Sequence, residues 1–247
     1  TGTVNVDAGG TITVVAGQDG VTGTAGQVEL DANGTTASIN VNDEVTTTGG
    51  AINILADDDV ILSADGDVTS GGGNVTVTAD ADTGGAASGA LTMADGAVIN
   101  AGSGTVDMDA NEDITLGSVV TTNATASAVS ITSSAAGVID GGDADTDIVA
   151  NSGTVTIDAV TGVGDADAID TQINTLDLDN TTSGNVDLNE TDDLDINQLD
   201  QNAAAGTVNV DAGGTITVVD GETGVSALAG QVELDANGIN SDIAVND

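Results

Sequence analysis

The chain has 247 residues, of which 41 are Asp or Glu, and it contains no Lys, Arg, His, Cys, Pro or aromatic residue. These absences exclude a disulfide framework, thiolate metal ligands, an imidazole general base and a catalytic triad. The formal net charge of −41 disfavours nucleic acid and anionic membranes as partners through long-range repulsion. No apolar run is long enough for membrane insertion. We therefore expect a protein that is not an enzyme.

Short alternating segments follow one another along the chain. Each is opened by an anchor in which a small residue is followed by two apolar residues at alternate positions. The anchors begin at Gly2, Gly26, Gly50, Gly73, Gly104, Ser127, Gly153, Gly184, Gly206 and Gly230. Alternation of apolar and polar residues predicts strands with one buried and one solvated face. Turn pairs such as Asn33–Gly34 and Asp65–Gly66 separate these strands, and no helical apolar stripe is present.

A longer repeat contains the shorter one. Residues 2–43 return as residues 206–247 at an offset of 204 residues, with 31 of 42 positions identical. Strands that recur every 22–31 residues with one face to bury predict an all-β fold, a right-handed parallel β-solenoid or β-helix. We expect eight coils in each 204-residue unit. Residues 1–247 should form one continuous solenoid, with residues 2–205 as one super-repeat and residues 206–247 as the start of the next copy.

The anchors also predict which side chains stack in the core. A first inward ladder should contain Val4, Val28, Ile52, Val75, Val106, Val129, Val155 and Val186. A second should contain Val6, Leu30, Ile54, Val77, Met108, Ile131, Ile157 and Leu188. A column of small residues should line a corner: Ala8, Ala32, Ala56, Ala79, Ala110, Ser133 and Ala159. A core this narrow explains the absence of aromatic residues.

The charge has a consequence for partners. About ten coils stacked roughly 4.8 Å apart give a rod of roughly 48 Å. Its negative charges lie about as densely as those of duplex DNA, which carries about one per 1.7 Å. Because the chain has no basic residue, we expect cations as partners.

Acidic clusters in the longer coils offer candidate metal ligands. The candidates are Asp143, Asp145, Asp147, Asp165 and Asp167. Calcium takes about six to eight oxygen ligands, which flexible acidic loops supply, so Ca²⁺ or another divalent cation is the one cofactor that the sequence suggests. The clusters match neither the EF-hand loop nor the glycine–aspartate nonapeptide of calcium β-rolls. Solvated surface charge is the alternative interpretation.

Whole segments also resemble a known class of protein. GTVNVDAGGTITVV at residues 2–15 and GALTMADGAVINAGSGTVDMDANEDITLGS at residues 89–118 are similar to the repeat regions of giant bacterial surface proteins. These include filamentous-haemagglutinin-like adhesins and very long repetitive exoproteins. The resemblance implies a β-helical shaft at the bacterial cell surface or in the extracellular space, serving adhesion or matrix structure.

Two functions follow from these expectations. The first is the structural shaft of an extracellular fibre, stalk or matrix, with further copies of the repeat along the fibre and lateral self-association as its partners. The second is an adhesin segment that binds a surface ligand through the loops of the longer coils, residues 73–103 and 153–183. The near-identical copies at residues 2–43 and 206–247 favour the shaft, because tandem copies add length more readily than specificity.

Overall fold

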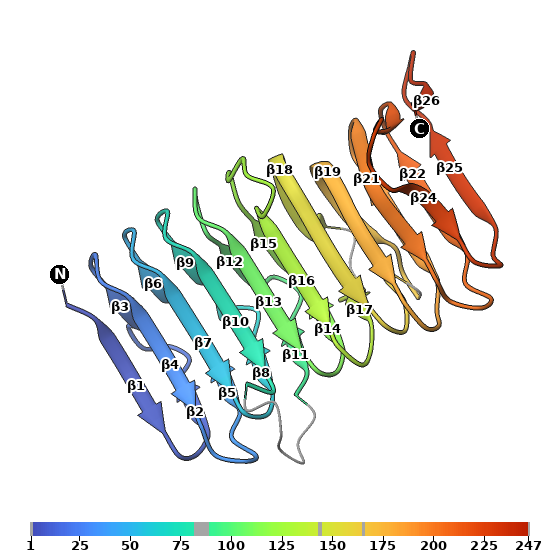
Figure 1. The fold of residues 1–247 in the computed structure, drawn as a ribbon. Coiled ribbons are helices and arrows are strands. Elements are labelled where there is room, and N and C mark those ends of the chain that lie inside the picture. The colour runs from blue at the N-terminus through green and yellow to red at the C-terminus, as the bar shows by residue number, and fades with distance from the viewer. Residues whose placement is uncertain (1, 82–88, 143–144, 165, 247) are drawn as a thin grey trace.

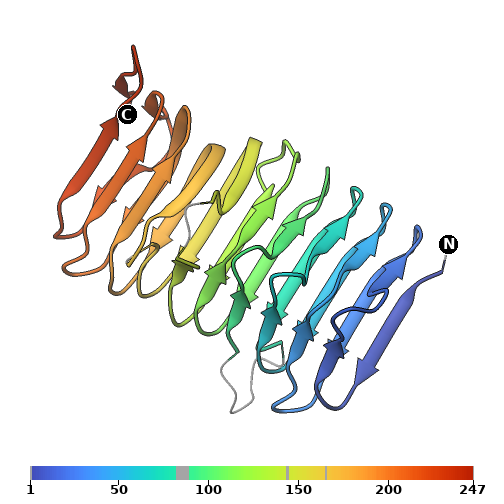
Figure 2. The same ribbon diagram turned by 180° about the vertical axis from the view of Figure 1, so that it is seen from behind.

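The computed structural model describes residues 2–81, 89–142, 145–164 and 166–246. It confirms the predicted fold class: over these residues there is no helix, and 26 strands stack in parallel as a β-solenoid of about ten turns. The turns follow one another along a straight shaft with the termini at opposite ends (Figure 1), and Figure 2 shows the same stack from behind. No described segment forms a helix that could cross a membrane.

In the N-terminal part of the shaft each turn contributes one strand to each of three faces. The first face is built from five-residue strands with apolar or small residues at positions one, three and five. These strands are β1 (Val4–Ala8), β4 (Val28–Ala32), β7 (Ile52–Ala56), β10 (Val75–Ala79), β13 (Val106–Ala110) and β16 (Val129–Ser133). They pair in parallel with no register shift, so like residues stack on like residues.

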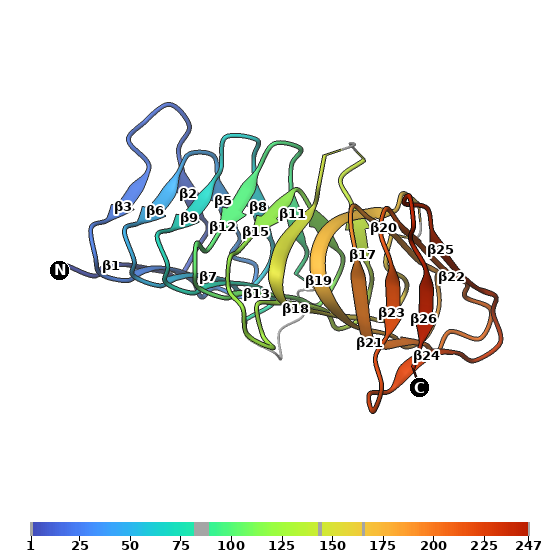
Figure 3. The same cartoon turned by 90° about the horizontal axis from the view of Figure 1, so that it is seen from above.

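The other two faces are built from three-residue strands. The second face holds β2 (Ile12–Val14), β5 (Ile39–Val41), β8 (Val60–Leu62), β11 (Leu91–Met93), β14 (Ile114–Leu116) and β17 (Val138–Asp140). The third face holds β3 (Val21–Gly23), β6 (Val45–Thr47), β9 (Val68–Ser70), β12 (Val98–Asn100) and β15 (Ser118–Val120). Figure 3, seen from above, shows the loops that leave the shaft between these faces.

The cross-section changes in the C-terminal part. Here β18 (Ile148–Ala159) and β19 (Ile169–Asn180) run from the third face into the first as single long strands, with a register shift after Ala150. The remaining strands are β20 (Val186–Glu190), β21 (Leu194–Gln201), β22 (Val208–Ala212), β23 (Ile216–Val218), β24 (Gly224–Ala227), β25 (Val232–Ala236) and β26 (Ile243–Val245).

The predicted ladders are correct as far as Val155 and wrong beyond it. Val155 stacks on Leu176, not on Val186, and Ile157 stacks on Leu178, not on Leu188. The segment that contains Leu176 and Leu178 alternates like the others but lacks a glycine anchor. Because the coils were counted from their glycine anchors, this coil was not predicted. Its side chains are nevertheless buried, so the core continues without a break.

As a result, the sequence repeat does not return to the same face of the solenoid. Eight steps along the first face lead from Val4 to Ile196, which is 12 residues short of Val208. Val208 stacks instead on Val186, which continues the second face through Val163. The 204-residue unit therefore spans eight turns and part of a ninth. Strand β22 has the sequence of β1, but it runs from the second face at Val208 to the third face at Ala212.

The anchor glycines have a steric cause. A Cβ atom built on Gly26 would overlap the carbonyl oxygen of Gly2 in the preceding turn, and one on Gly50 would overlap that of Gly26. The same overlap recurs at Gly73 and Gly104. Adjacent turns thus approach too closely at this corner for any side chain, which is why glycine opens nearly every coil.

Candidate functional site

The residues predicted to bind calcium do not form a common site in the described structure. Asp143 and Asp165 lie outside the described residues. Asp145 and Asp167 are exposed in the turns before β18 and β19, respectively, whereas Asp147 is buried. Among the residues that the structure describes, no group of three or more acidic side chains is placed so that it could hold a metal ion.

Asp147 instead has a structural contact between turns. Its Oδ2 accepts a hydrogen bond of 2.8 Å from the backbone N–H of Asp170, and its own N–H donates to the carbonyl oxygen of Asp170 at 2.8 Å. The backbone N–H of Val119 donates to the carbonyl oxygen of Asp147 at 2.7 Å. This residue therefore bridges three consecutive turns.

The contact made by Asp147 is one case of a recurring arrangement. Five aspartates stand directly before a strand, and each accepts a backbone N–H from the following turn at 2.7–3.0 Å. They are Asp59, Asp67, Asp113, Asp147 and Asp193. Buried backbone donors need a partner, and these carboxylates provide one where the ladder begins. We call these five residues the strand-start aspartates.

On the outer surface, where the chain has no basic side chains, side-chain amides donate hydrogen bonds to the carboxylates. Asparagine Nδ2 groups donate to carboxylates of neighbouring turns, as in Asn33 to Asp7 at 2.7 Å and Asn237 to Asp211 at 2.6 Å. The same contact joins Asn5 to Glu29, Asn189 to Asp170, Asn202 to Asp179 and Asn209 to Asp187. Because donors to a carboxylate favour its charged form, these amides make the stacked acidic residues tolerable without basic residues.

Glu190 is a buried acidic residue whose pKa is strongly raised. It is 4% exposed and stands in register with Ala212, where the repeat pattern calls for a small residue. Its Oε2 accepts hydrogen bonds from Thr171 Oγ1 at 2.8 Å and the Ile173 N–H at 3.0 Å, and its Oε1 accepts from the Asp192 N–H at 3.1 Å. Burial raises the pKa of Glu190 to about 7, against the lowering effect of these three donors.

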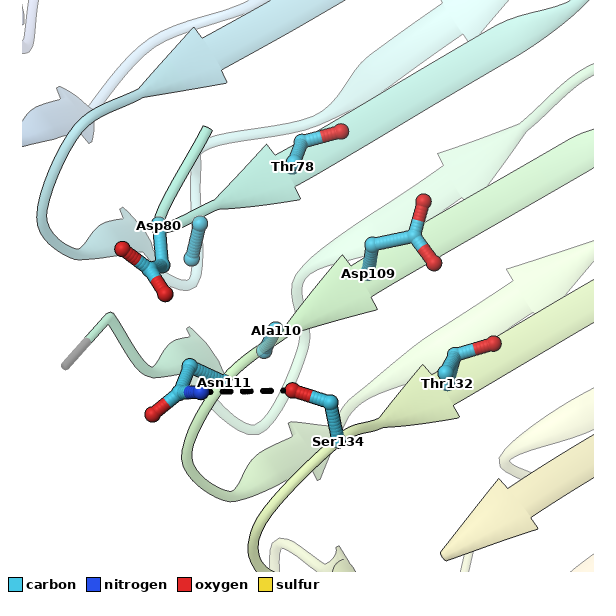
Figure 4. Close-up of a pocket in the computed structure, with 8 residues that line it drawn as sticks. Thr78, Asp80, Asp109, Ala110, Asn111, Thr132 and Ser134 are labelled. Atoms are coloured by element: carbon cyan, nitrogen blue, oxygen red, sulfur yellow. Dashed lines mark hydrogen bonds between the residues drawn. The ribbon is translucent and has the colours of Figure 1, made fainter. Parts of the chain in front are cut away.

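A shallow groove of about 360 Å³ lies across β10, β13 and β16 (Figure 4). Its polar lining is Thr78, Asp80, Asp109, Asn111, Thr132 and Ser134. Asn111 Nδ2 donates to Ser134 Oγ at 3.3 Å. Burial raises the pKa of Asp109, the charge of Asp107 raises it further, and a hydrogen bond from Thr132 lowers it. These hydroxyls, amides and carboxylates can bind a polar ligand.

A second groove, of about 250 Å³, lies nearer the C-terminus. Its lining includes the carboxylates of Asp158, Asp177, Asp179 and Glu222 together with Asn197 and Gln198. Burial raises the pKa of Asp158, and the charge of Asp179 in the next turn raises it further. Both grooves are open furrows between outward-facing side chains of adjacent turns. The sequence signal for the second groove is the pair Asp158 and Asp179, which stand in register on adjacent turns. In the first groove Asp109 stands between Thr78 and Thr132, so no stack of acidic residues marks it.

Comparisons with protein-family models, with curated proteins and with solved structures found no match to this chain.

Proposed function

We propose that this chain is a structural shaft: a non-catalytic segment of an extracellular or cell-surface fibre, stalk or matrix made by a long repetitive bacterial protein of the filamentous-haemagglutinin-like kind. The observation that carries the proposal is the unbroken ladder of about ten turns around one continuous apolar core. Each turn contacts only its neighbours, so further copies of the repeat extend the length without altering the packing.

The contacts of the acidic residues favour a structural role over a catalytic one. The strand-start aspartates and the amide–carboxylate contacts use many carboxylates to join turns. A rod of this charge repels other copies at low ionic strength, and Ca²⁺ or other cations are its proposed partners in bundling. It has no nucleic acid partner and inserts no segment into a membrane.

Antibodies raised against the 247-residue chain test the shaft proposal. Immunogold labelling of the source cells should decorate extracellular filaments or the cell surface at regular intervals. Labelling confined to the cell interior would contradict the proposal, whatever the purified chain does in solution.

An adhesin segment is the second candidate, and one observation favours it. The groove that contains Asp80 and Asp109 is lined in part by residues of the longest coil, residues 73–103. Binding of the chain to an array of surface glycans, lost in Asp109→Ala and kept in Asp95→Ala, would support this candidate. Asp95 is an exposed residue outside the groove lining.

A further inference from the structure

The corner between the second and third faces is uneven along the shaft. The connection between these faces has six residues from β2 to β3, three from β5 to β6, five from β8 to β9 and four from β11 to β12. It has a single residue, Gly117, from β14 to β15, and seven residues from β17 to β18. Figure 3 shows these connections projecting to different heights along one side of the shaft. A short connection between two longer ones leaves a notch in the corner.

The first of two such notches, the Gly117 notch, has a volume of about 380 Å³. The Ser118 N–H donates to the Ala97 carbonyl oxygen at 2.9 Å, which holds the short connection against the preceding turn. A Cβ atom on Gly117 would lie 2.7 Å from the same oxygen, so the connection requires glycine.

The lining of the Gly117 notch combines apolar and acidic groups. Val98 and Val149, half-buried residues of β12 and β18, supply apolar surface. Asp95 and Asp145 are exposed in the turns on either side. The notch therefore offers a carboxylate on each side of an apolar surface.

The second notch, the Asp43 notch, lies three turns nearer the N-terminus, at the three-residue connection between β5 and β6. Its volume is also about 380 Å³, and its acidic lining is Asp43, Glu44, Asp65 and Asp67. The Gln18 N–H donates to Asp43 Oδ2 at 2.8 Å, and the Val98 N–H donates to Asp67 Oδ1 at 3.0 Å. Contacts between turns thus hold these two carboxylates in place.

The two linings together define the chemistry of an occupant. A lysine side chain has an aliphatic stem, which packs on apolar surface, and a charged head, which stays with carboxylates and water. In the Gly117 notch the stem would contact Val98 and Val149, and the ammonium group would meet Asp95 and Asp145. Because the sequence contains no Lys or Arg, a second copy of it cannot supply this cation. The occupant must come from a chain of different sequence.

The distance between the notches fixes the spacing of two lysines. Three turns with a rise of about 4.8 Å each separate the notches by about 14 Å. An extended chain advances about 3.3 Å per residue, so four residues cover about 13 Å, and side chains four residues apart point to the same side. An extended segment that lies along the corner can therefore place two lysines, four residues apart, in the two notches.

We propose that this corner of the shaft binds an extended basic segment of a partner protein, with one lysine in the Gly117 notch and a second, four residues away, in the Asp43 notch. The residues between the lysines cross the connections of the two intervening turns, so small residues fit best there. This binding goes beyond the shaft function and does not depend on it.

Two synthetic peptides of equal composition and charge test the spacing. In GKSGSKG the lysines are four residues apart, and in GKKSGSG they are adjacent; both peptides are acetylated and amidated. Calorimetric titration into the 247-residue chain at about 0.15 M sodium chloride limits the reach of diffuse attraction to about 8 Å. GKSGSKG should bind about tenfold more tightly, because it alone fills both notches at once. Equal affinities would overturn the proposal.

Variants of the chain test the place of binding. Val98→Lys puts a cation of the chain's own into the Gly117 notch and should weaken GKSGSKG binding about tenfold. The matched control Thr76→Lys, a half-buried outward position on the first face, makes the same change of charge and should bind like the wild type. Equal weakening in both variants would overturn the proposal, since it would show attraction to the overall charge. Circular dichroism checks that both variants fold.

A second pair of variants repeats the test without adding a side chain. Asp95→Asn should weaken GKSGSKG binding about threefold, as expected for the loss of one exposed ion pair. Asp109→Asn, on the first face and outside both notches, should leave binding unchanged. No difference between these two variants would overturn the proposal and leave the shaft function standing. Labelling confined to the cell interior would refute the shaft function and leave the peptide binding standing.

Discussion

Glu190→Gln should remove a large part of the pH dependence of stability. The pKa of Glu190 is about 7 in the folded chain, against an ordinary value of 4.5. Between these two values the folded chain holds one more proton than the unfolded chain, so the free energy of unfolding falls as the pH rises. One pKa unit corresponds to about 1.4 kcal/mol. The stabilisation present below pH 4.5 is therefore reduced by about 3 kcal/mol when the pH has risen past 7.

Glutamine keeps the shape of the side chain and removes its titration. Its amide group must face one of the three donors that now approach the carboxylate, at a cost of about 1 kcal/mol for the lost hydrogen bond. At pH 8 the variant should therefore be more stable than the wild type by about 2 kcal/mol. At pH 4.5 it should be equal or slightly less stable, since Glu190 is then protonated in the folded chain and half protonated in the unfolded chain.

Urea unfolding followed by circular dichroism at half-unit steps from pH 4.5 to pH 8, in constant salt, measures this difference. Urea is preferred to guanidinium because guanidinium would screen the acidic surface. Glu112→Gln, an exposed change of the same kind, serves as the control for net charge. If wild type and Glu190→Gln lose stability in parallel over this range, the assignment of the raised pKa to a buried Glu190 is wrong.

Three further predictions concern the stacking of turns and the ions around them. Gly50→Ala should destabilise the chain by about 3 kcal/mol or more, because its Cβ overlaps the carbonyl of Gly26, whereas Gly9→Ala, which meets nothing within 4 Å, should be neutral in urea unfolding. Asp113→Ala leaves the Gly137 N–H without its acceptor and should cost about 1–3 kcal/mol, while Asp113→Asn keeps an acceptor and should cost less. Sodium chloride should raise the melting temperature steadily, because all direct interactions between charged side chains in the chain are repulsive. Calcium at matched ionic strength should raise the melting temperature further only if acidic loops bind it. Identical melting curves in chelator, sodium and calcium would refute both effects.

The fold could be predicted from the sequence because the sequence shows both the two-residue alternation within each strand and the spacing from one coil to the next. Alternation fixes which side chains enter the core, and the anchor glycines mark the corner where turns approach most closely. The ladders that begin at Val4 and Val6 were therefore correct over seven turns.

The prediction failed where a coil has no glycine. The strand β19 (Ile169–Asn180) alternates on either side of Asn174 and Thr175, neither of which is buried, and it passes from one face to the next there without a glycine. Counting anchors thus missed one coil. The later anchors do stack on one another, but they begin on the second face and not on the first. The alternation LDLDN at residues 176–180 was the signal that could have revealed the missing coil.

The sequence specifies the candidate site less completely than the fold. Acidic clusters indicate charge, but the sequence does not tell whether a carboxylate faces solvent or the next turn. Asp147, which was predicted as a metal ligand, accepts a hydrogen bond from the backbone N–H of Asp170 in the next turn. Its position directly before a strand, shared with Asp59 and Asp113, is the sequence signal for that role. Glu190 could have been found as the residue that breaks the column of small residues.

The mismatch between the 204-residue repeat and the turns shows what determines position in this fold. Strands β1 and β22 have the same sequence, yet β1 lies on the first face and β22 begins on the second. Both faces accept apolar residues at alternate positions, so the local sequence fits either one. The face that a strand occupies is decided by the preceding turn, because the strand pairs with the strand edge that this turn leaves open. Identical outward residues such as Asp7 and Asp211 therefore point in different directions from the shaft, and a fibre built from such units presents the same chemistry on more than one side.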